Sequence, residues 1–272
     1  MTPVTIPLWL VRKWSERTTP PPTDGSGYRR RMGGHRFAAA VGAADRFALW
    51  ESVLRELAPT TMAEVGVYRG EFAERILRAV PSIERYVLID PWRHLPQWNK
   101  PFNAPTADLE AAMAETVERL AFAGDRVEVL RGTTAEVVGQ LDDASTDVVY
   151  VDGDHTLRGI TLDLTLMWPK VAPGGVLGGD DFRPSVWQHD RRFEPTFVFP
   201  YAVYAAEAFG HPIHALGHHQ FAIDLADEPF AFHDHTAAFD STAVLDALGE
   251  RGSATAGVRS SKLRGAVRRR GR

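Results

Sequence analysis

The sequence contains no cysteine, and this absence removes several kinds of chemistry. The chain can form no disulfide and offers no thiol nucleophile, so any metal ion has to be bound by oxygen or imidazole ligands.

Long apolar runs are missing too. The run at residues 6–11 contains Pro7, is far too short to span a membrane and lacks the flanks of a signal peptide. We therefore expect a cytoplasmic protein without a membrane partner.

A large excess of either charge is also lacking. The 272 residues carry a formal net charge of -4, which gives no global electrostatic reason to expect nucleic acid as a partner. With 44% hydrophobic residues, the chain can bury the core of one α/β domain. We expect a flexible or loosely docked N-terminal arm at 1–40, the domain at 41–226, and a C-terminal extension at 227–272. The extension ends in a basic tail at 259–272, which we expect to be solvated.

Short β-rich runs alternate with longer amphipathic stretches in the middle of the chain, as is typical of repeated βα units around a parallel sheet. Two further apolar runs, at 212–216 and 220–225, flank a turn-like Gly217 and predict an antiparallel hairpin. We therefore predict an α/β fold with a doubly wound, mostly parallel, seven-stranded Rossmann-like sheet and an antiparallel C-terminal hairpin. The predicted parallel strands are 62–67, 86–90, 127–131, 148–152 and 176–179, and the predicted helices are 43–57, 71–80, 107–123, 135–141, 157–171 and 203–209.

The first predicted strand runs into a turn framed by Gly66 and Gly70. Glycines in such a turn allow the backbone to approach a ligand closely. The G-x-x-x-G spacing differs from that of dinucleotide folds, and the Gly-Lys-Ser/Thr of a phosphate-binding loop is absent, so both ligand classes are disfavoured. The second strand ends at Asp90, whose carboxylate can accept both hydroxyl protons of a ribose. Together these residues predict a ribose-bearing ligand, although such a glycine turn alone can also serve helix packing.

A small polar turn, Gly132, Thr133 and Thr134, follows the third predicted strand. Its hydroxyl and amide groups can contact the edge of an adenine ring. Thr133 or Thr134 is equally suited to cap the helix that begins at Ala135, and the sequence leaves both interpretations open.

Carboxylates follow the fourth and fifth predicted strands: Asp152 ends the fourth, and Asp180 and Asp181 end the fifth. If these strands are neighbours, their negative charge requires a cation, and oxygen ligands favour Mg²⁺ or Mn²⁺. His155, just beyond Asp152, can then remove a proton from a hydroxyl that the metal has acidified. The alternative is that these acids cap helices and turns, for which Asp154 and Asp181 are well placed.

With these motifs assembled, residues 62–224 resemble the class I S-adenosylmethionine-dependent methyltransferases, in particular the metal-dependent small-molecule O-methyltransferases of the macrocin and mycinamicin type. The resemblance implies S-adenosylmethionine and Mg²⁺ (or Mn²⁺) as cofactors, and a small-molecule hydroxyl, on a sugar or natural product, as the acceptor. The matching positions are Glu64, Gly66, Tyr68 and Gly70 in the first cofactor motif, Asp90 as the ribose-binding acid, Gly132, Thr133 and Thr134 at the adenine pocket, Asp152, Asp180 and Asp181 as metal ligands, and His155 with Asp152 as catalytic residues.

Two other functions stay open at this point: a catalytically silent scaffold that binds S-adenosylmethionine, and a methyltransferase with a macromolecular acceptor. The intact acids and His155 disfavour the first. The lack of an Asn or Asp followed by Pro-Pro after the fourth strand, where base-modifying relatives carry it, disfavours the second.

The loops and the C-terminal region carry further candidates. Acceptor selection is expected to involve Trp92, Trp98, Trp187 and His189, for which lid or core packing is an equal alternative. The histidines of the hairpin and the C-terminal region, among them His214, are expected to be solvated rather than to form a second metal site. Whether the chain forms a homo-oligomer is left open.

Overall fold

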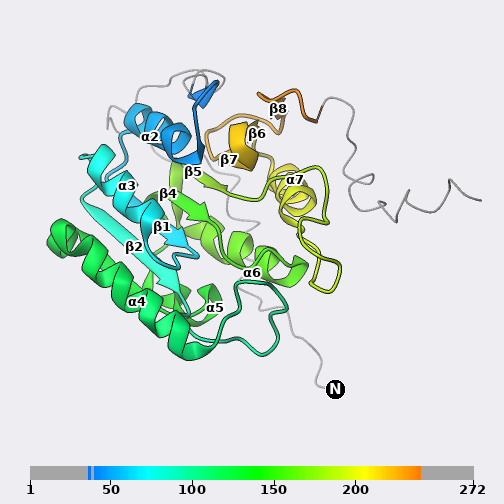
Figure 1. The fold of residues 1–272 in the computed structure, drawn as a ribbon. Coiled ribbons are helices and arrows are strands. Elements are labelled where there is room, and N and C mark those ends of the chain that lie inside the picture. The colour runs from blue at the N-terminus through cyan, green and yellow to red at the C-terminus, as the bar shows by residue number, and fades with distance from the viewer. Residues whose placement is uncertain (1–35, 38–39, 240–272) are drawn as a thin grey trace, which may run out of the picture. The chain divides into compact units, whose positions relative to one another are not determined.

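One mixed sheet organises the part of the chain that the structure describes (Figure 1). The structure is a computed structural model that describes residues 36–37 and 40–239, all within the unit Met32–Arg272. The strands are β1 (Thr61–Val65), β2 (Arg85–Asp90), β3 (Val127–Arg131), β4 (Thr146–Val151), β5 (Val171–Gly179), β6 (Ile213–Leu216), β7 (Gln220–Asp224) and β8 (Phe232–Asp234). The helices are α2 (Arg46–Leu57), α3 (Glu71–Ala79), α4 (Thr106–Leu120), α5 (Thr134–Val137), α6 (Leu157–Met167) and α7 (Val198–Phe209), with short 3-10 helices η3 (Ala121–Arg126), η4 (Val138–Gln140), η5 (Trp168–Lys170) and η6 (Gly217–His219).

The strand order β3-β2-β1-β4-β5-β7-β6-β8 places β1 at the point where the chain changes direction across the sheet. From β3 to β5 the neighbouring strands are parallel, and β7 joins β5 in the antiparallel sense. In open α/β sheets, ligands bind outside the carboxyl ends of the strands at such a switch point. The predicted parallel sheet and the antiparallel hairpin, formed by β6 and β7, are confirmed.

Helices cover both faces of the sheet because successive residues of a strand point to opposite sides. Met62 on β1 packs in the cluster formed with α2, α3 and α4, whereas its neighbour Ala63 packs in the cluster formed with α5, α6 and α7. The two sets of helices therefore lie on opposite faces of the sheet (Figure 1). This doubly wound arrangement leaves the loops at the carboxyl ends of the strands to build a site.

The sheet has eight strands, where the sequence predicts seven. The additional strand β8 pairs in parallel with β6, and His233 lies opposite His214. Three residues are too few to show an alternating pattern, and β8 therefore has no detectable signal in the sequence. His214 is 1% exposed and stacks on His233 with 4.6 Å between ring centroids, so the expectation that it is solvated is wrong.

Residues outside both predicted limits of the domain also pack on this sheet. Phe37 is fully buried, and Arg36 Nη1 lies 2.8 Å from Asp224 Oδ1. Phe239 is 7% exposed and packs against α7. The described part of the domain therefore extends beyond 41–226 at both ends, and the other residues of the predicted arm and the basic tail lie outside the described residues. None of the described helices is long and apolar enough to cross a membrane.

Candidate functional site

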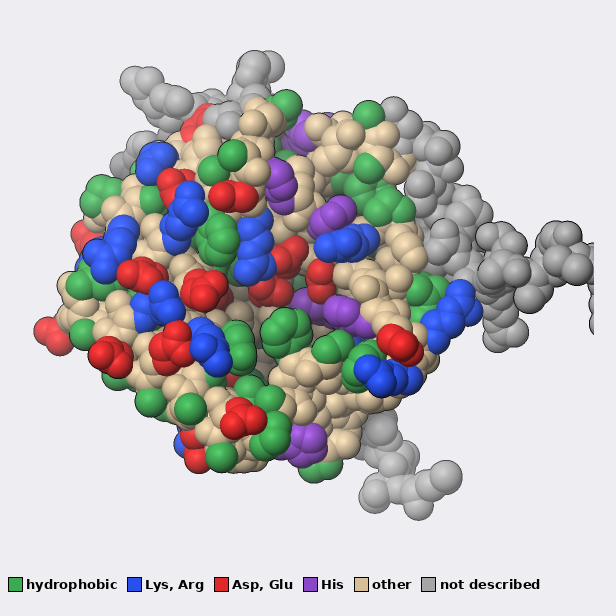
Figure 2. Space-filling model, viewed as in Figure 1, with side chains coloured by type: hydrophobic (Ala, Val, Ile, Leu, Met, Phe, Trp, Pro, Cys, Tyr) green, Lys and Arg blue, Asp and Glu red, His purple; other side chains and the backbone are tan. Residues whose placement is uncertain are grey.

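A cavity of about 540 Å³ lies at the carboxyl ends of β1, β2, β3, β4 and β5. Pockets for small molecules and cofactors measure roughly 300–1,000 Å³, so this cavity is large enough for such a ligand. Figure 2 shows acidic side chains gathered in a hollow at the centre of this face, with histidine and basic side chains around them. The predicted site residues that line the cavity are Glu64, Gly66, Tyr68, Asp90, Gly132, Thr133, Thr134, Asp152, His155, Asp180 and Asp181.

Gly66 allows the ends of β1 and β4 to meet. It has a φ of +87°, and a Cβ atom on it would lie 2.2 Å from the carbonyl oxygen of Asp152. A side chain here would force the two strand ends apart and strain the backbone. Gly70 has a different role, as the N-cap of α3. Its φ is 71°, and a Cβ atom there would lie 2.8 Å from Thr116 Cγ2. Gly70 therefore shapes the turn without lining the cavity.

The carboxylate of Asp90 holds this turn in place. Oδ2 accepts hydrogen bonds from the backbone amides of Val67 and Tyr68 at 2.9 and 3.0 Å, and Oδ1 accepts one from the amide of Trp92 at 2.8 Å. Burial raises the pKa of Asp90, and these three amides counteract the rise. A carboxylate has about four acceptor positions. These three bonds leave one position, on Oδ1, for a further donor.

Glu64 lies at the inner end of the cavity and is 2% exposed. It accepts a hydrogen bond of 2.7 Å from the hydroxyl of Tyr86. Burial is the main cause that raises the pKa of Glu64 to about 8. Near neutral pH the carboxyl group is therefore largely protonated, and it can donate as well as accept a hydrogen bond.

The polar turn after β3 has a structural role besides lining the cavity. Thr133 forms a capping box with Glu136 at the start of α5, which confirms the helix-cap alternative. Thr134 Oγ1 donates a hydrogen bond of 2.6 Å to Asp163 Oδ1. Asp163 is 7% exposed, lines the cavity, and has its pKa raised to about 7 by burial. Contact between this turn and an adenine ring stays a prediction.

The carboxylates predicted at the ends of β4 and β5 come together around His155. His155 Nδ1 lies 2.5 Å from Asp181 Oδ2, and Nε2 lies 3.4 Å from Asp152 Oδ1. Nε2 is buried and makes no hydrogen bond. Burial opposes the charged form of His155, but the two carboxylates outweigh burial and raise its pKa to about 10. Against the effect of burial, His155 in turn lowers the pKa of Asp181.

Arg46, which the sequence did not single out, lies between Asp152 and Asp180. Its Nη1 atom is 2.9 Å from Asp152 Oδ2 and also donates to Asp180 Oδ2. Asp180 Oδ1 accepts hydrogen bonds of 2.6 Å from Gln220 Nε2 and 2.7 Å from the amide of Asp181. Burial and the charge of Asp152 raise the pKa of Asp180, and the charge of Arg46 counteracts them.

The oxygen ligands at these strand ends are of the type that Mg²⁺ and Mn²⁺ prefer. However, the Oδ2 atoms of Asp152 and Asp180 both point to Arg46 Nη1, and Asp181 Oδ2 contacts His155. Among residues 36–37 and 40–239, no three His, Asp or Glu side chains are placed to hold one metal ion. The described arrangement therefore does not fit a divalent ion bound by these three acids.

Of the residues predicted to select the acceptor, three line the cavity, Trp92, Trp98 and His189. The Nε1 atom of Trp98 is buried without a hydrogen-bond partner. Trp92 is 1% exposed and donates a hydrogen bond of 2.7 Å from Nε1 to the carbonyl oxygen of Tyr68. Trp187 packs on the core instead.

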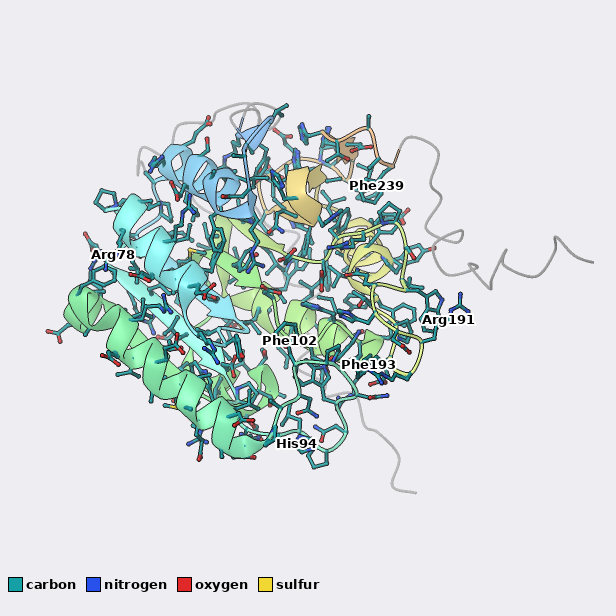
Figure 3. All side chains as sticks on the ribbon, in the orientation of Figure 1. Arg78, His94, Phe102, Arg191, Phe193 and Phe239 are labelled. Carbon is teal, nitrogen blue, oxygen red and sulfur yellow. The ribbon has the colours of Figure 1, made fainter. Side chains whose placement is uncertain are left out.

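Two more residues of the loop after β2, Lys100 and Phe102, line the cavity. Phe102, labelled in Figure 3, is 61% exposed and packs edge-on against Tyr68 with 5.8 Å between ring centroids. Lys100 is 7% exposed, and its Nζ donates to Thr196 Oγ1 at 3.0 Å. This bond connects the loop after β2 to the segment before α7, so both loops shape the same part of the cavity.

Two residues at the site, Asp163 and Arg46, were not predicted from the sequence. A sequence pattern could have revealed Asp163, because it falls on the helical face of α6 that also carries Ile160, Leu164 and Met167, all buried. An acid within an apolar stripe needs a partner or faces a site. No sequence pattern could have revealed Arg46, since the two acids that it contacts, Asp152 and Asp180, are 106 and 134 residues away in the sequence.

Comparison with known proteins gives a match for the segment that contains most of this site. Residues 63–182 match the model of a family described as a methyltransferase domain. A search of curated proteins gave no match. Similar solved structures include a proposed caffeoyl-CoA O-methyltransferase from Staphylococcus aureus, with 13% identity, a TM-score of 0.48, and coverage of 81% of this chain and 93% of that one.

Two further similar structures come from other organisms. The O-methyltransferase TomG from Streptomyces achromogenes, involved in tomaymycin synthesis, has 20% identity, a TM-score of 0.44, and coverage of 64% of this chain and 76% of that one. The methyltransferase PaMTH1 from Podospora anserina has 15% identity, a TM-score of 0.46, and coverage of 65% and 76%.

The segment that matches the family model contains the glycine turn, Asp90, the polar turn after β3 and the acids with His155. It also spans the switch point between β1 and β4, where the cavity lies. Residues 63–182 therefore match a methyltransferase domain, and this segment supplies most of the residues that line the cavity.

Proposed function

We propose that the chain transfers the methyl group of S-adenosylmethionine to a hydroxyl of a small molecule, such as a sugar or another natural product. The observation that carries this proposal is the position of His155, which lines the cavity with Nδ1 against Asp181 and with Nε2, which makes no hydrogen bond, 3.4 Å from Asp152 Oδ1. An alcohol is a weak nucleophile until a base removes its proton, and an imidazole oriented in this way is suited to act as that base.

The proposal divides the cavity into one part for each ligand. The glycine turn at Gly66, the carboxylate of Asp90 and the polar turn after β3 line the part at β1, β2 and β3, which fits the cofactor. S-adenosylmethionine supplies an electrophilic methyl group when it is bound. The part at β4 and β5, with His155, Trp98 and His189, is left for the acceptor. An acceptor hydroxyl bound there would lie close to His155, so the chain would contribute chiefly by positioning.

Asp181 orients His155 and stabilises its charged form. With Nδ1–H directed at Asp181 Oδ2, 2.5 Å away, the proton-accepting atom of the neutral imidazole is Nε2. Its pKa of about 10 means that His155 is mostly protonated at neutral pH, so the neutral form has to appear before the hydroxyl can be deprotonated. When Nε2 takes the proton of the hydroxyl, the resulting imidazolium is again stabilised by Asp181.

Other parts of the sequence-based prediction remain proposals. They are the small-molecule acceptor, the lack of a nucleic-acid partner, a homo-oligomeric state and the cytoplasmic location. Dependence on Mg²⁺ or Mn²⁺ is not among them, because Asp152, Asp180 and Asp181 could hold an ion together only if Arg46 left its present position.

The test is methyl transfer by the purified chain from isotopically labelled S-adenosylmethionine to a panel of hydroxylated sugars and polyketides, with products identified by mass spectrometry. The wild type should form an O-methyl product. His155→Ala should lower turnover by about 10²-fold or more, the usual contribution of a general base, while it still binds S-adenosylhomocysteine. His94→Ala is the matched control, because His94 is exposed and does not line the cavity (Figure 3).

Two results would contradict the proposal. Unchanged turnover in His155→Ala would remove His155 from the chemistry. Methyl groups found only on nitrogen or carbon atoms of the accepted molecules would show that the acceptor is not a hydroxyl.

A further inference from the structure

We infer that Arg46 is the resident cation of the acids at the ends of β4 and β5, in the position that a divalent ion would otherwise take. Its Nη1 atom lies 2.9 Å from Asp152 Oδ2 and donates to Asp180 Oδ2 as well, so that both carboxylates converge on one nitrogen. Arg46 is thus a positioning residue that fixes the two acids without a metal. The inference rests on the proposed function in one respect, which is that the acids serve methyl transfer.

The other oxygens of these acids are directed elsewhere. Asp180 Oδ1 accepts from Gln220 Nε2 and from the amide of Asp181, at 2.6 and 2.7 Å. Asp152 Oδ1 faces His155 Nε2 at 3.4 Å, and Asp181 Oδ2 faces His155 Nδ1 at 2.5 Å. A divalent ion shared by Asp152 and Asp180 would therefore have to displace the guanidinium group from both Oδ2 atoms.

The fold holds the start of α2 beside the acids. Arg46 is the first residue of this helix, and the N-cap Asp45 accepts a hydrogen bond of 2.7 Å from the amide of Ala48. One turn further on, Trp50 Nε1 donates to Gln220 Oε1 at 2.9 Å. Because Gln220 also binds the acid at the end of β5, one chain of hydrogen bonds connects α2, β7 and that acid.

The balance of charge agrees with this role. Arg46 contacts Asp152 and Asp180, whereas Asp181 faces His155 and has Arg183 Nε 3.9 Å from its Oδ1 atom. Without Arg46, the first two acids would lie side by side with no counter-charge between them, and a dissolved cation would be attracted to that position. A guanidinium group stays protonated at any physiological pH, so it fixes the acids whatever the supply of metal.

The direct test is Mn²⁺ binding to the purified full chain, measured from the electron paramagnetic resonance signal of free Mn²⁺, with neither cofactor nor acceptor present. Arg46→Met removes the charge and keeps a long unbranched side chain. Arg55→Met is the matched control on the same helix, where Arg55 is exposed and pairs with Glu51 at 3.2 Å. Arg46→Met should bind one Mn²⁺ ion at this site. The wild type and Arg55→Met should bind Mn²⁺ there at least about tenfold more weakly than Arg46→Met. Adding Asp180→Asn to Arg46→Met should abolish the gain.

Tight binding of one Mn²⁺ by the wild type, lost in Asp180→Asn, would overturn the role of Arg46. A folded Arg46→Met chain that gains no Mn²⁺ binding would overturn it too. If Arg46→Met does not fold, the wild-type titration alone decides the question. Methyl transfer by the wild type should also survive EDTA, and activity lost in EDTA and restored by Mg²⁺ would contradict the inference. A complete lack of methyl transfer would count against the proposed function but would leave the Mn²⁺ result valid.

Discussion

His155 Nδ1 lies 2.5 Å from Asp181 Oδ2, while Nε2 of the same ring faces Asp152 Oδ1 at 3.4 Å. These two carboxylates raise the pKa of His155 to about 10, even though burial opposes the charge. The imidazole is therefore held in the form that cannot accept a proton over most of the physiological range. With His155 as the proposed base, the reaction would proceed through the minor, neutral form, and its rate would depend on how much of this form is present.

We predict a pH–rate profile that rises with pH. Below a pKa of about 10 the neutral form of His155 increases about tenfold per pH unit, and kcat should rise with it between pH 7 and 9. Asp152→Asn removes one of the two carboxylates that stabilise the charged form, so the rise should begin and level off at lower pH. A profile that is flat between pH 7 and 9, or unchanged in Asp152→Asn, would exclude His155 as the base.

Asp90→Asn should weaken binding of S-adenosylhomocysteine. Asparagine replaces one carboxylate oxygen with an NH₂ group that cannot accept a hydrogen bond, so the turn loses either the bonds from the amides of Val67 and Tyr68 or the bond from the amide of Trp92. Losing such bonds to a charged group costs about 1.5–3 kcal/mol, and we expect affinity to fall by about tenfold or more. Calorimetric titration measures the change.

Asp147→Asn is the control for this prediction. Asp147 Oδ2 also accepts bonds from backbone amides, those of Thr60 and Thr61, but at the opposite ends of the strands. Its replacement should lower the free energy of unfolding and leave the affinity unchanged. Equal losses of affinity in the two variants would show that Asp90 acts only through general stability.

Asp163→Ala should raise KM for S-adenosylmethionine more than it lowers kcat. The carboxyl group of Asp163 lines the cavity and accepts a hydrogen bond of 2.6 Å from the Thr134 hydroxyl, so it steadies the polar turn after β3, where we propose that the cofactor binds. We expect KM to rise by about tenfold. Thr165→Ala, on the same helix but facing Tyr201, is the control and should leave KM unchanged. A loss confined to kcat would contradict this role.

Acid should destabilise the chain partly through His214. Burial lowers the pKa of His214 from 6.5 to about 3, so between these values the unfolded chain binds a proton that the folded chain does not. The free energy of unfolding should therefore fall by up to about 1.4 kcal/mol per pH unit from this group as pH drops through that window. His214→Phe should make the fall less steep in urea titrations at pH 4 to 7. The exposed His94→Phe serves as the control and should leave the slope unchanged.

Most of the sheet could be predicted from the sequence because its signals are local. The apolar runs that became β1 to β5 and the hairpin of β6 and β7 are each long enough to show a pattern. The turn at Gly66 and the acid Asp90 were found in the same way, because each directly follows a strand. The ends of parallel strands meet at one edge, so finding the strands also predicted that Asp152 and Asp180 come together.

What escaped prediction depends on contacts between distant segments. Arg46 meets its acids only after α2 has packed on the sheet, and nothing near it in the sequence marks the contact. The burial of His214 depends on β8 and on Phe37, whose ring centroid lies 4.4 Å from that of His214. The state of the acids also could not be predicted, since carboxylates at strand ends indicate the need for a cation without specifying whether the cation is a metal or a side chain.

The most direct measurement is calorimetric titration of S-adenosylhomocysteine into the purified chain and into Gly66→Val. The wild type should bind one equivalent with micromolar affinity. The variant should remain folded by circular dichroism yet bind at least about tenfold more weakly, because a side chain at Gly66 meets the carbonyl oxygen of Asp152 and displaces the turn. A folded wild-type chain that binds neither S-adenosylhomocysteine nor S-adenosylmethionine would contradict the assignment of this cavity as the cofactor site.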